Sequence, residues 1–181
     1  MIIGLTGKNA SGKGEAAAYL KKKGFEYHSL SDVLREEATK RNIEHTRDNL
    51  ISLGNQLRKK FGANYLARKI NQKMQSSHVE DFVVDSIRSP FEIEELRKNK
   101  DFVLVAIDAP AEIRFERLLK RDRLGDAATL EEFKIQEEKE NLNNPSGQQL
   151  DKCISMADQK VVNDGQLEHL HQKIDKLIKN V

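Results

Sequence analysis

Eight residues near the start of the chain constrain its fold most strongly. Residues 7–14 read GKNASGKG, so two glycines stand five positions apart and Lys13 follows the second one. The apolar run Ile2 to Thr6 precedes this segment, and a helical pattern from Glu15 to Lys23 follows it. In such a strand–loop–helix unit, backbone N–H groups, the helix N-terminus and the lysine all attract anions. The segment therefore predicts a loop that binds the phosphates of a nucleotide, rather than a plain strand–turn–helix corner.

The rest of the chain alternates short apolar runs with amphipathic stretches. Several runs are apolar at consecutive positions, as in parallel strands that are covered on both faces. The expected strands are Ile2 to Thr6, Phe25 to Ser29, Phe82 to Asp85, Phe102 to Asp108 and Lys160 to Asn163. This alternation predicts an α/β fold in which a five-stranded parallel sheet lies between two layers of helices.

The length of 181 residues suits one domain that spans residues 1–181. We expect its core in residues 1–30, 80–121 and 158–181. Residues 31–76 hold only helical signal, which predicts a helical insertion that binds an acceptor, and a polar break at about 122–130 predicts a short lid. Ordinary solvated connections are the alternative for both segments.

Composition excludes several classes of protein. The chain has 31 basic and 29 acidic residues, a near balance that argues against a long basic groove for nucleic acid. A single cysteine, Cys153, excludes an internal disulfide and a cysteine-rich zinc site. No apolar run approaches the ~20 residues that a membrane span needs, so we expect no membrane association and a cytoplasmic protein.

Polar motifs follow the later expected strands. The second strand leads into SLSDVLR at residues 29–35, and the third leads into DSIR at residues 85–88. The fourth precedes a helical pattern that carries Arg117 and Arg121, and Asn163 stands at the end of the fifth. Each motif alone also has an ordinary structural explanation. SLSDVLR fits a capped helix, DSIR a turn at a strand end, the arginines a solvated basic helix, and Asn163 an Asn-Asp-Gly turn.

Together with the loop at residues 7–14, these motifs resemble the P-loop nucleoside monophosphate kinases. The likeness includes adenylate kinase, relatives of dephospho-CoA kinase, and the kinase-like domain fused to some deoxycytidylate deaminases. It implies a three-layer fold with a short lid, and ATP and Mg²⁺ as co-substrate and cofactor. One position departs from many P-loop proteins, because Gly14 stands where a Ser or Thr would ligate Mg²⁺, and Glu15 follows it.

The resemblance also implies roles for individual residues. Lys13, Asp85, Arg88 and Arg121 would be catalytic, with Asp85 also holding Mg²⁺ through water. Asp32, Arg35, Arg68 and Arg88 would bind the acceptor. The residues that would bind ATP are Gly7, Lys8, Asn9, Ala10, Ser11, Gly12, Lys13, Gly14, Glu15, Arg117 and Asn163.

The implied activity is transfer of the γ-phosphoryl group of ATP to a nucleotide-like acceptor, with a (deoxy)nucleoside monophosphate as the first choice. Dephospho-CoA kinase is the enzymatic alternative, although Gly14 and Glu15 depart from the Ser-Thr usual in that family. A non-catalytic domain that senses ATP or dNTP is the alternative of another class, but such a domain could dispense with Arg35, Arg88 and Arg121. We expect small-molecule nucleotides as partners and a monomer or homodimer, and the resemblance allows fusion to, or partnership with, a nucleotide-metabolising enzyme.

Overall fold

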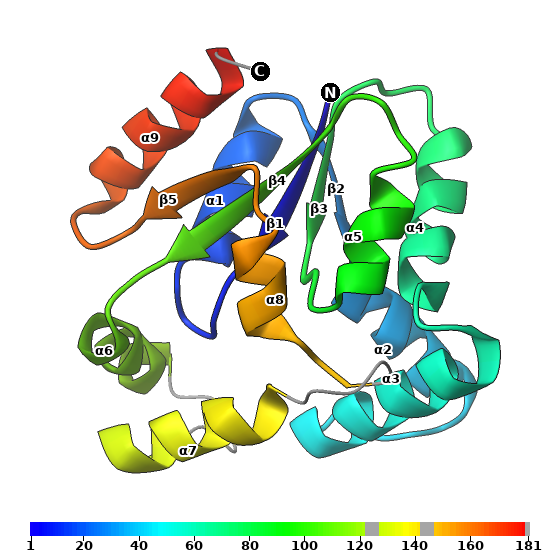
Figure 1. The fold of residues 1–181 in the computed structure, drawn as a ribbon, viewed down its shortest axis with the longest axis horizontal. Helices are drawn as coiled ribbons and strands as arrows, with labels where there is room; N and C mark the ends of the chain where they lie inside the picture. Colours follow the sequence, from blue (N-terminus) through cyan, green and yellow to red (C-terminus); the bar gives the residue numbers. More distant parts are fainter. Residues whose placement is uncertain (122–126, 142–146, 180–181) are drawn as a thin grey trace.

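A five-stranded parallel sheet forms the centre of the protein (Figure 1). The computed structural model describes residues 1–121, 127–141 and 147–179. The strands are β1 (Ile2–Thr6), β2 (Glu26–Ser29), β3 (Phe82–Asp85), β4 (Phe102–Asp108) and β5 (Gln159–Val162), in the order β2-β3-β1-β4-β5. All neighbouring pairs are parallel, and β1 lies in the middle, with Ile2 beside both Phe82 and Phe102. The expected α/β fold is confirmed. Compared with the expected strands, β2 begins one residue later and β5 begins and ends one residue earlier.

One face of the sheet is covered by α1 (Lys13–Lys22) and α9 (Leu167–Lys179). Successive side chains of a strand point to opposite faces, so Ile3 and Leu5 of β1 pack with Leu20 of α1 and Ile174 of α9. The amphipathic pattern of α9 and the small apolar residues of α1 supply this contact, and α1 begins directly after the loop at residues 7–12.

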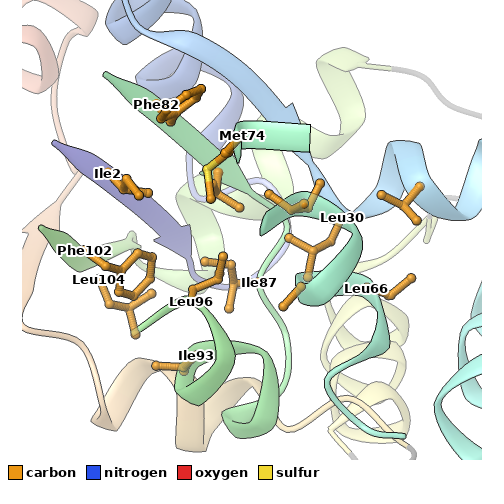
Figure 2. Close-up of a cluster of buried hydrophobic side chains, with 14 of the residues drawn as sticks. Ile2, Leu30, Leu66, Met74, Phe82, Ile87, Ile93, Leu96, Phe102 and Leu104 are labelled. Atoms are coloured by element: carbon orange, nitrogen blue, oxygen red, sulfur yellow. The ribbon is translucent and has the colours of Figure 1, made fainter. Parts of the chain in front are cut away.

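The opposite face is covered by α2 (Leu30–Lys40), α4 (Tyr65–Gln75), α5 (Pro90–Leu96) and α8 (Leu150–Ser155). Figure 2 shows the resulting core, one cluster that includes Leu30 and Leu66 of the helices and Phe82 and Phe102 of the strands. Residues 31–76 hold α2, α3 and α4 with short connections between them, and α2 and α4 belong to the cover of the sheet.

Three more helices surround the carboxyl ends of the strands. The helix α3 (Arg47–Phe61) packs on α2, and α6 (Ala111–Arg121) packs on α7 (Leu130–Glu140) around Phe133. A capping box at Thr129 starts α7, because the side chains and backbone of Thr129 and Glu132 bond each other reciprocally. Most of the lid expected at 122–130 lies outside the described residues. None of the helices in the described ranges has the length and apolarity needed to cross a bilayer.

Candidate functional site

The loop between β1 and α1 depends on two glycines. Gly7 has φ +138°, and a Cβ there would lie 2.1 Å from the carbonyl oxygen of Ile107. Gly12 has φ +104°, and a Cβ there would lie 2.1 Å from Nδ2 of Asn163. Both positions therefore exclude any side chain, because the positive φ disfavours it and a neighbouring atom occupies the space of the Cβ. The neighbouring Gly14 has no such constraint, since a Cβ there would meet nothing within 4 Å.

Lys13 folds back over this loop. Its Nζ donates hydrogen bonds of 2.8 Å to the carbonyl oxygens of Gly7 and Lys8. Burial lowers the pKa of Lys13 from its ordinary value of 10.5 to about 8; the nearby Asp85 carboxylate opposes this shift and Arg88 reinforces it. The amine is thus held over the loop in surroundings that favour a negatively charged partner.

Asn163 and Arg117 attach the loop to the end of β5. The Asn163 side-chain amide donates to the carbonyl oxygen of Ser11 at 2.9 Å, and Arg117 donates to the carbonyl oxygen of Asn163 at 3.0 Å. A longer contact of 3.5 Å joins Arg117 to the same Ser11 carbonyl. The structure therefore brings both residues to the loop, where they contact its backbone.

Asp85 ends β3 beside the loop. One of its carboxylate oxygens accepts a 2.6 Å hydrogen bond from the backbone N–H of Ser86, a residue with φ +66°. Such left-handed conformations are uncommon for serine and concentrate at functional sites. Asp85 is buried and acts electrostatically on Lys13, but its side chain does not line the cavity described next.

A cavity of about 300 Å³ opens in front of the loop. Apolar side chains from α2, α3 and α4 form part of its wall, and none of the described residues that line it is acidic. The basic side chains that line it, beside His45, are Lys13, Arg35, Arg47, Arg58, Arg88 and Arg121. This arrangement suits an anion that also carries an apolar or aromatic part.

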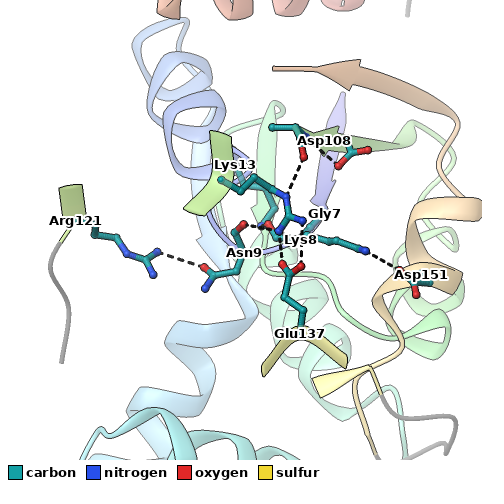
Figure 3. A network of polar contacts seen from close by, with 10 residues as sticks. Gly7, Lys8, Asn9, Lys13, Asp108, Arg121, Glu137 and Asp151 are labelled. Carbon is teal, nitrogen blue, oxygen red and sulfur yellow. Dashed lines mark hydrogen bonds and ion pairs between the residues drawn. The ribbon is translucent and has the colours of Figure 1, made fainter. Parts of the chain in front are cut away.

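Three predicted arginines meet at this cavity from different elements. Arg88 follows β3 and donates a 3.0 Å hydrogen bond to Oε1 of Gln148. Arg121, at the end of α6, reaches Oδ1 of the loop residue Asn9 at 3.3 Å (Figure 3). Arg35 lies on α2 and forms an exposed 2.6 Å ion pair with Asp32.

Other predicted residues do not reach the cavity. Arg68, predicted to bind the acceptor, is exposed, donates to the carbonyl oxygen of Phe61 and does not line the cavity. The turn of α4 on which Arg68 lies faces the end of α3, because Leu66 and Ile70 occupy the face toward the sheet. Asp32 contacts Arg35 but does not line the cavity, and Glu15 is exposed.

Two buried ion pairs near the site escaped the sequence analysis. Arg114 is 4% exposed, bonds the Asn9 carbonyl at 3.3 Å and pairs with Glu137 of α7. Arg58 pairs with the fully buried Glu92 at 2.9 Å. Each pair joins residues 23 or 34 positions apart, and no local pattern in the sequence indicates such partners.

Segments far apart in the chain also meet the loop itself. Figure 3 shows Glu137 below the loop and the side chain of Lys8 directed toward Asp151, 3.6 Å away on α8. The loop is therefore contacted by α6, by α8 and by Asn163 after β5, while Glu137 of α7 pairs with Arg114, which bonds the loop.

The comparisons with known proteins agree with this geometry. A family described as AAA domain (AAA_18) matches residues 3–140. A UPF0200 protein of Pyrococcus abyssi is 37% identical over 186 residues, which cover 100% of this chain and 97% of that protein. A UPF0200 protein of Pyrococcus furiosus is 36% identical over 185 residues, at 98% and 96% coverage.

Solved structures show the same fold. TT1252 from Thermus thermophilus superposes with a TM-score of 0.62 at 21% identity and covers 100% of this chain and 97% of its own. A shikimate kinase from Bacteroides thetaiotaomicron gives 0.59 at 15% identity, with 99% and 98% coverage. The expected P-loop kinase-like fold is confirmed, and the chain belongs to the UPF0200 family of AAA-domain proteins.

Proposed function

We propose that the protein transfers the γ-phosphoryl group of ATP to a nucleotide-like acceptor, with a (deoxy)nucleoside monophosphate as the preferred class. The observation that carries this proposal is the shared cavity of Lys13, Arg35, Arg88 and Arg121 in front of the loop. A domain that only senses nucleotide would need the loop but not the arginines beyond it. Their presence around one cavity supports an enzyme with two ligands.

In this proposal the loop amides and Lys13 hold the phosphates of ATP. Arg88 lines the cavity together with residues of the loop, α2 and α3, and would contact the transferred phosphoryl group or the acceptor phosphate. Arg121 approaches from α6 and would neutralise charge that spreads over the moving group. Arginines in such positions accelerate phosphoryl transfer by about 10³-fold or more. The chemistry is positional and electrostatic and needs no covalent intermediate.

Asp85 fits a water-mediated role toward Mg²⁺. The ion keeps several waters and is often bound by only one or two carboxylates together with the nucleotide phosphates. Asp85 supplies one buried carboxylate next to Lys13, and no cluster of three acidic, His or Cys ligands exists in the described residues. When bound, Mg²⁺ would neutralise phosphate charge, while Asp85 orients its water ligands.

A hydroxyl-bearing acid is a second candidate acceptor. Structural neighbours include proteins described as shikimate kinase and gluconokinase, at 15–17% identity. The arginines that line the cavity would bind a carboxylate in the same forked geometry as a phosphate. Dephospho-CoA, whose acceptor is a ribose hydroxyl, belongs in the same test.

A panel assay tests the proposal. Mg²⁺ and ATP are incubated with each NMP, each dNMP, dephospho-CoA, shikimate and gluconate, and ADP and the phosphorylated product are both measured. Transfer to a monophosphate supports the proposal, and transfer only to another member of the panel reassigns the acceptor. ATP binding without transfer to any of these compounds would contradict it.

Two matched variants control this assay. Lys13→Ala should abolish transfer while the protein stays folded, because the loop loses its cation. Lys22→Ala removes an exposed lysine from the same helix and should leave transfer unchanged. Full activity in Lys13→Ala would contradict the assigned role of the loop.

A further inference from the structure

Arg88 is held at three points by residues that are distant in the sequence or on the next helix. Its backbone N–H donates to Oε2 of Glu92 at 2.9 Å. Its backbone carbonyl accepts a 2.8 Å hydrogen bond from the N–H of Gln149, and its guanidinium donates to Gln148 at 3.0 Å. The segment before α8, 60 residues away in the sequence, therefore lies against Arg88 and fixes where its side chain enters the cavity.

The chemistry of the two side chains determines how the Gln148 amide is oriented. A guanidinium has donors only, so the atom of Gln148 that faces Arg88 must be the carbonyl oxygen. The amide nitrogen, with its two N–H donors, consequently points elsewhere. Gln148 is 7% exposed and lines the cavity, and none of the described residues accepts a hydrogen bond from this nitrogen.

Because Gln148 lines the cavity, its N–H donors can bond a ligand that occupies this space. The Gln148 side chain contacts the Arg88 guanidinium through its carbonyl oxygen, and both residues line a cavity that has no described acidic residue. Two adjacent donors of this kind match two oxygens of one phosphate group.

We propose that Gln148 is a positioning residue of the phosphoryl-transfer site, which orients Arg88 through its carbonyl oxygen and donates an N–H to the acceptor phosphate. The donor role of Gln148 rests on the proposed function, because that function identifies the ligand as a phosphate. The contact of Gln148 with Arg88 is independent of the function. The two roles use different atoms of one side chain, so two substitutions separate them.

Gln148→Met removes both roles at similar volume. Gln148→Glu keeps an oxygen for Arg88 but replaces the N–H donors by a negative charge. Gln72→Met is the control, because Gln72 is exposed on α4 and does not line the cavity. Thermal unfolding of each variant shows whether it is folded before the other measurements.

The first measurement does not depend on activity. In protein labelled with ¹⁵N-arginine, the Arg88 guanidinium signals are identified by their loss in Arg88→Lys. An ordered guanidinium should give resolved signals in the wild-type, Gln148→Glu and Gln72→Met proteins. We expect these signals to broaden or shift to the free-arginine position in Gln148→Met. Unchanged signals in Gln148→Met would overturn the positioning role.

The second measurement tests the donor. With the loop saturated by a non-hydrolysable ATP analogue, each protein is titrated calorimetrically with the best monophosphate of the panel and with its uncharged nucleoside. Both Gln148 variants should weaken monophosphate binding by about tenfold or more and nucleoside binding by less than about twofold. The KM for the acceptor should rise with the same ratio, while the KM for ATP stays the same.

The outcomes distinguish this inference from the proposed function. Monophosphate affinity unchanged in both variants overturns the donor role, even where transfer is observed. If the wild-type protein binds and phosphorylates no monophosphate, the proposed acceptor and the donor role both fail. The Arg88 signals then still decide whether Gln148 orients Arg88.

Discussion

Nucleotide binding should draw a proton onto Lys13, because the free loop holds the pKa of this amine at about 8. Phosphate oxygens in place of the loop carbonyls would favour the charged amine and return its pKa toward the ordinary value of 10.5. In the free protein at pH 8, about half of the molecules then carry a neutral Lys13. Among the other charged groups that act on Lys13, Asp85 and Glu137 favour the charged form, while Arg88 and Arg114 oppose it.

The size of the uptake follows from this pKa. Binding should take up about 0.1 proton at pH 7, about 0.5 at pH 8 and about 0.9 at pH 9. Nucleotide affinity should consequently fall above pH 8, by at most about tenfold per pH unit.

The free energy of unfolding of the nucleotide-free protein changes with pH in the opposite sense. Since the folded pKa is lowered, the unfolded chain binds more protons between pH 8 and 10.5, and the free energy of unfolding rises with pH across this window.

Calorimetry measures the uptake directly. A non-hydrolysable ATP analogue is titrated at pH 7, 8 and 9 in two phosphate-free buffers with different ionisation enthalpies. The difference between the two observed enthalpies gives the number of protons. Lys13→Arg is the control, because arginine stays protonated throughout this range and should bind without uptake. Equal enthalpies in both buffers at pH 8 and 9 would refute the argument.

The remaining predictions concern the glycines and a buried carboxylate. Gly12→Ala should lower nucleotide affinity at least tenfold, because its Cβ would clash at a position with left-handed backbone. Gly14→Ala is the control and should bind nucleotide normally. Equal affinities of the two variants by calorimetry would contradict the loop geometry. Glu92→Gln should destabilise the protein by about 3 kcal/mol, since it leaves Arg58 buried without a counter-charge. Denaturant unfolding checks this value against the exposed Glu94→Gln, and similar unfolding midpoints for the two variants would argue against it.

The centre of the sheet was predictable from the sequence because β1, β3 and β4 are short apolar runs between polar turns. The runs at Ile2–Thr6, Phe82–Asp85 and Phe102–Asp108 match the observed strands at both ends. The β5 boundary is less clear in the sequence, since Gln159 and Lys160 are polar although they pair with β4. Pairing with β4 determines where β5 begins, and the local sequence pattern does not indicate this pairing.

The site was predictable only where a residue lies next to its motif in the chain. Lys13, Arg88 and Arg121 reach the cavity because they follow the ends of β1, β3 and β4 along the chain, and those ends share one edge of the parallel sheet. Gln148 was not found, because it reaches Arg88 through a segment 60 residues away with no periodic pattern of its own. The sequence does not show that Arg68 lies away from the cavity, because packing determines how α4 is rotated about its axis.

The central position of β1 has a consequence for synthesis of the protein. Both neighbours of β1 come late in the chain, since Ile2 pairs with Phe82 and Phe102, and Gly7 fits against Ile107 of β4. About 100 residues must therefore leave the ribosome after β1 before it is paired on both sides, which takes about 5–20 s at ordinary translation rates. During that interval the apolar strand has free edges on which a chaperone or another nascent chain can act.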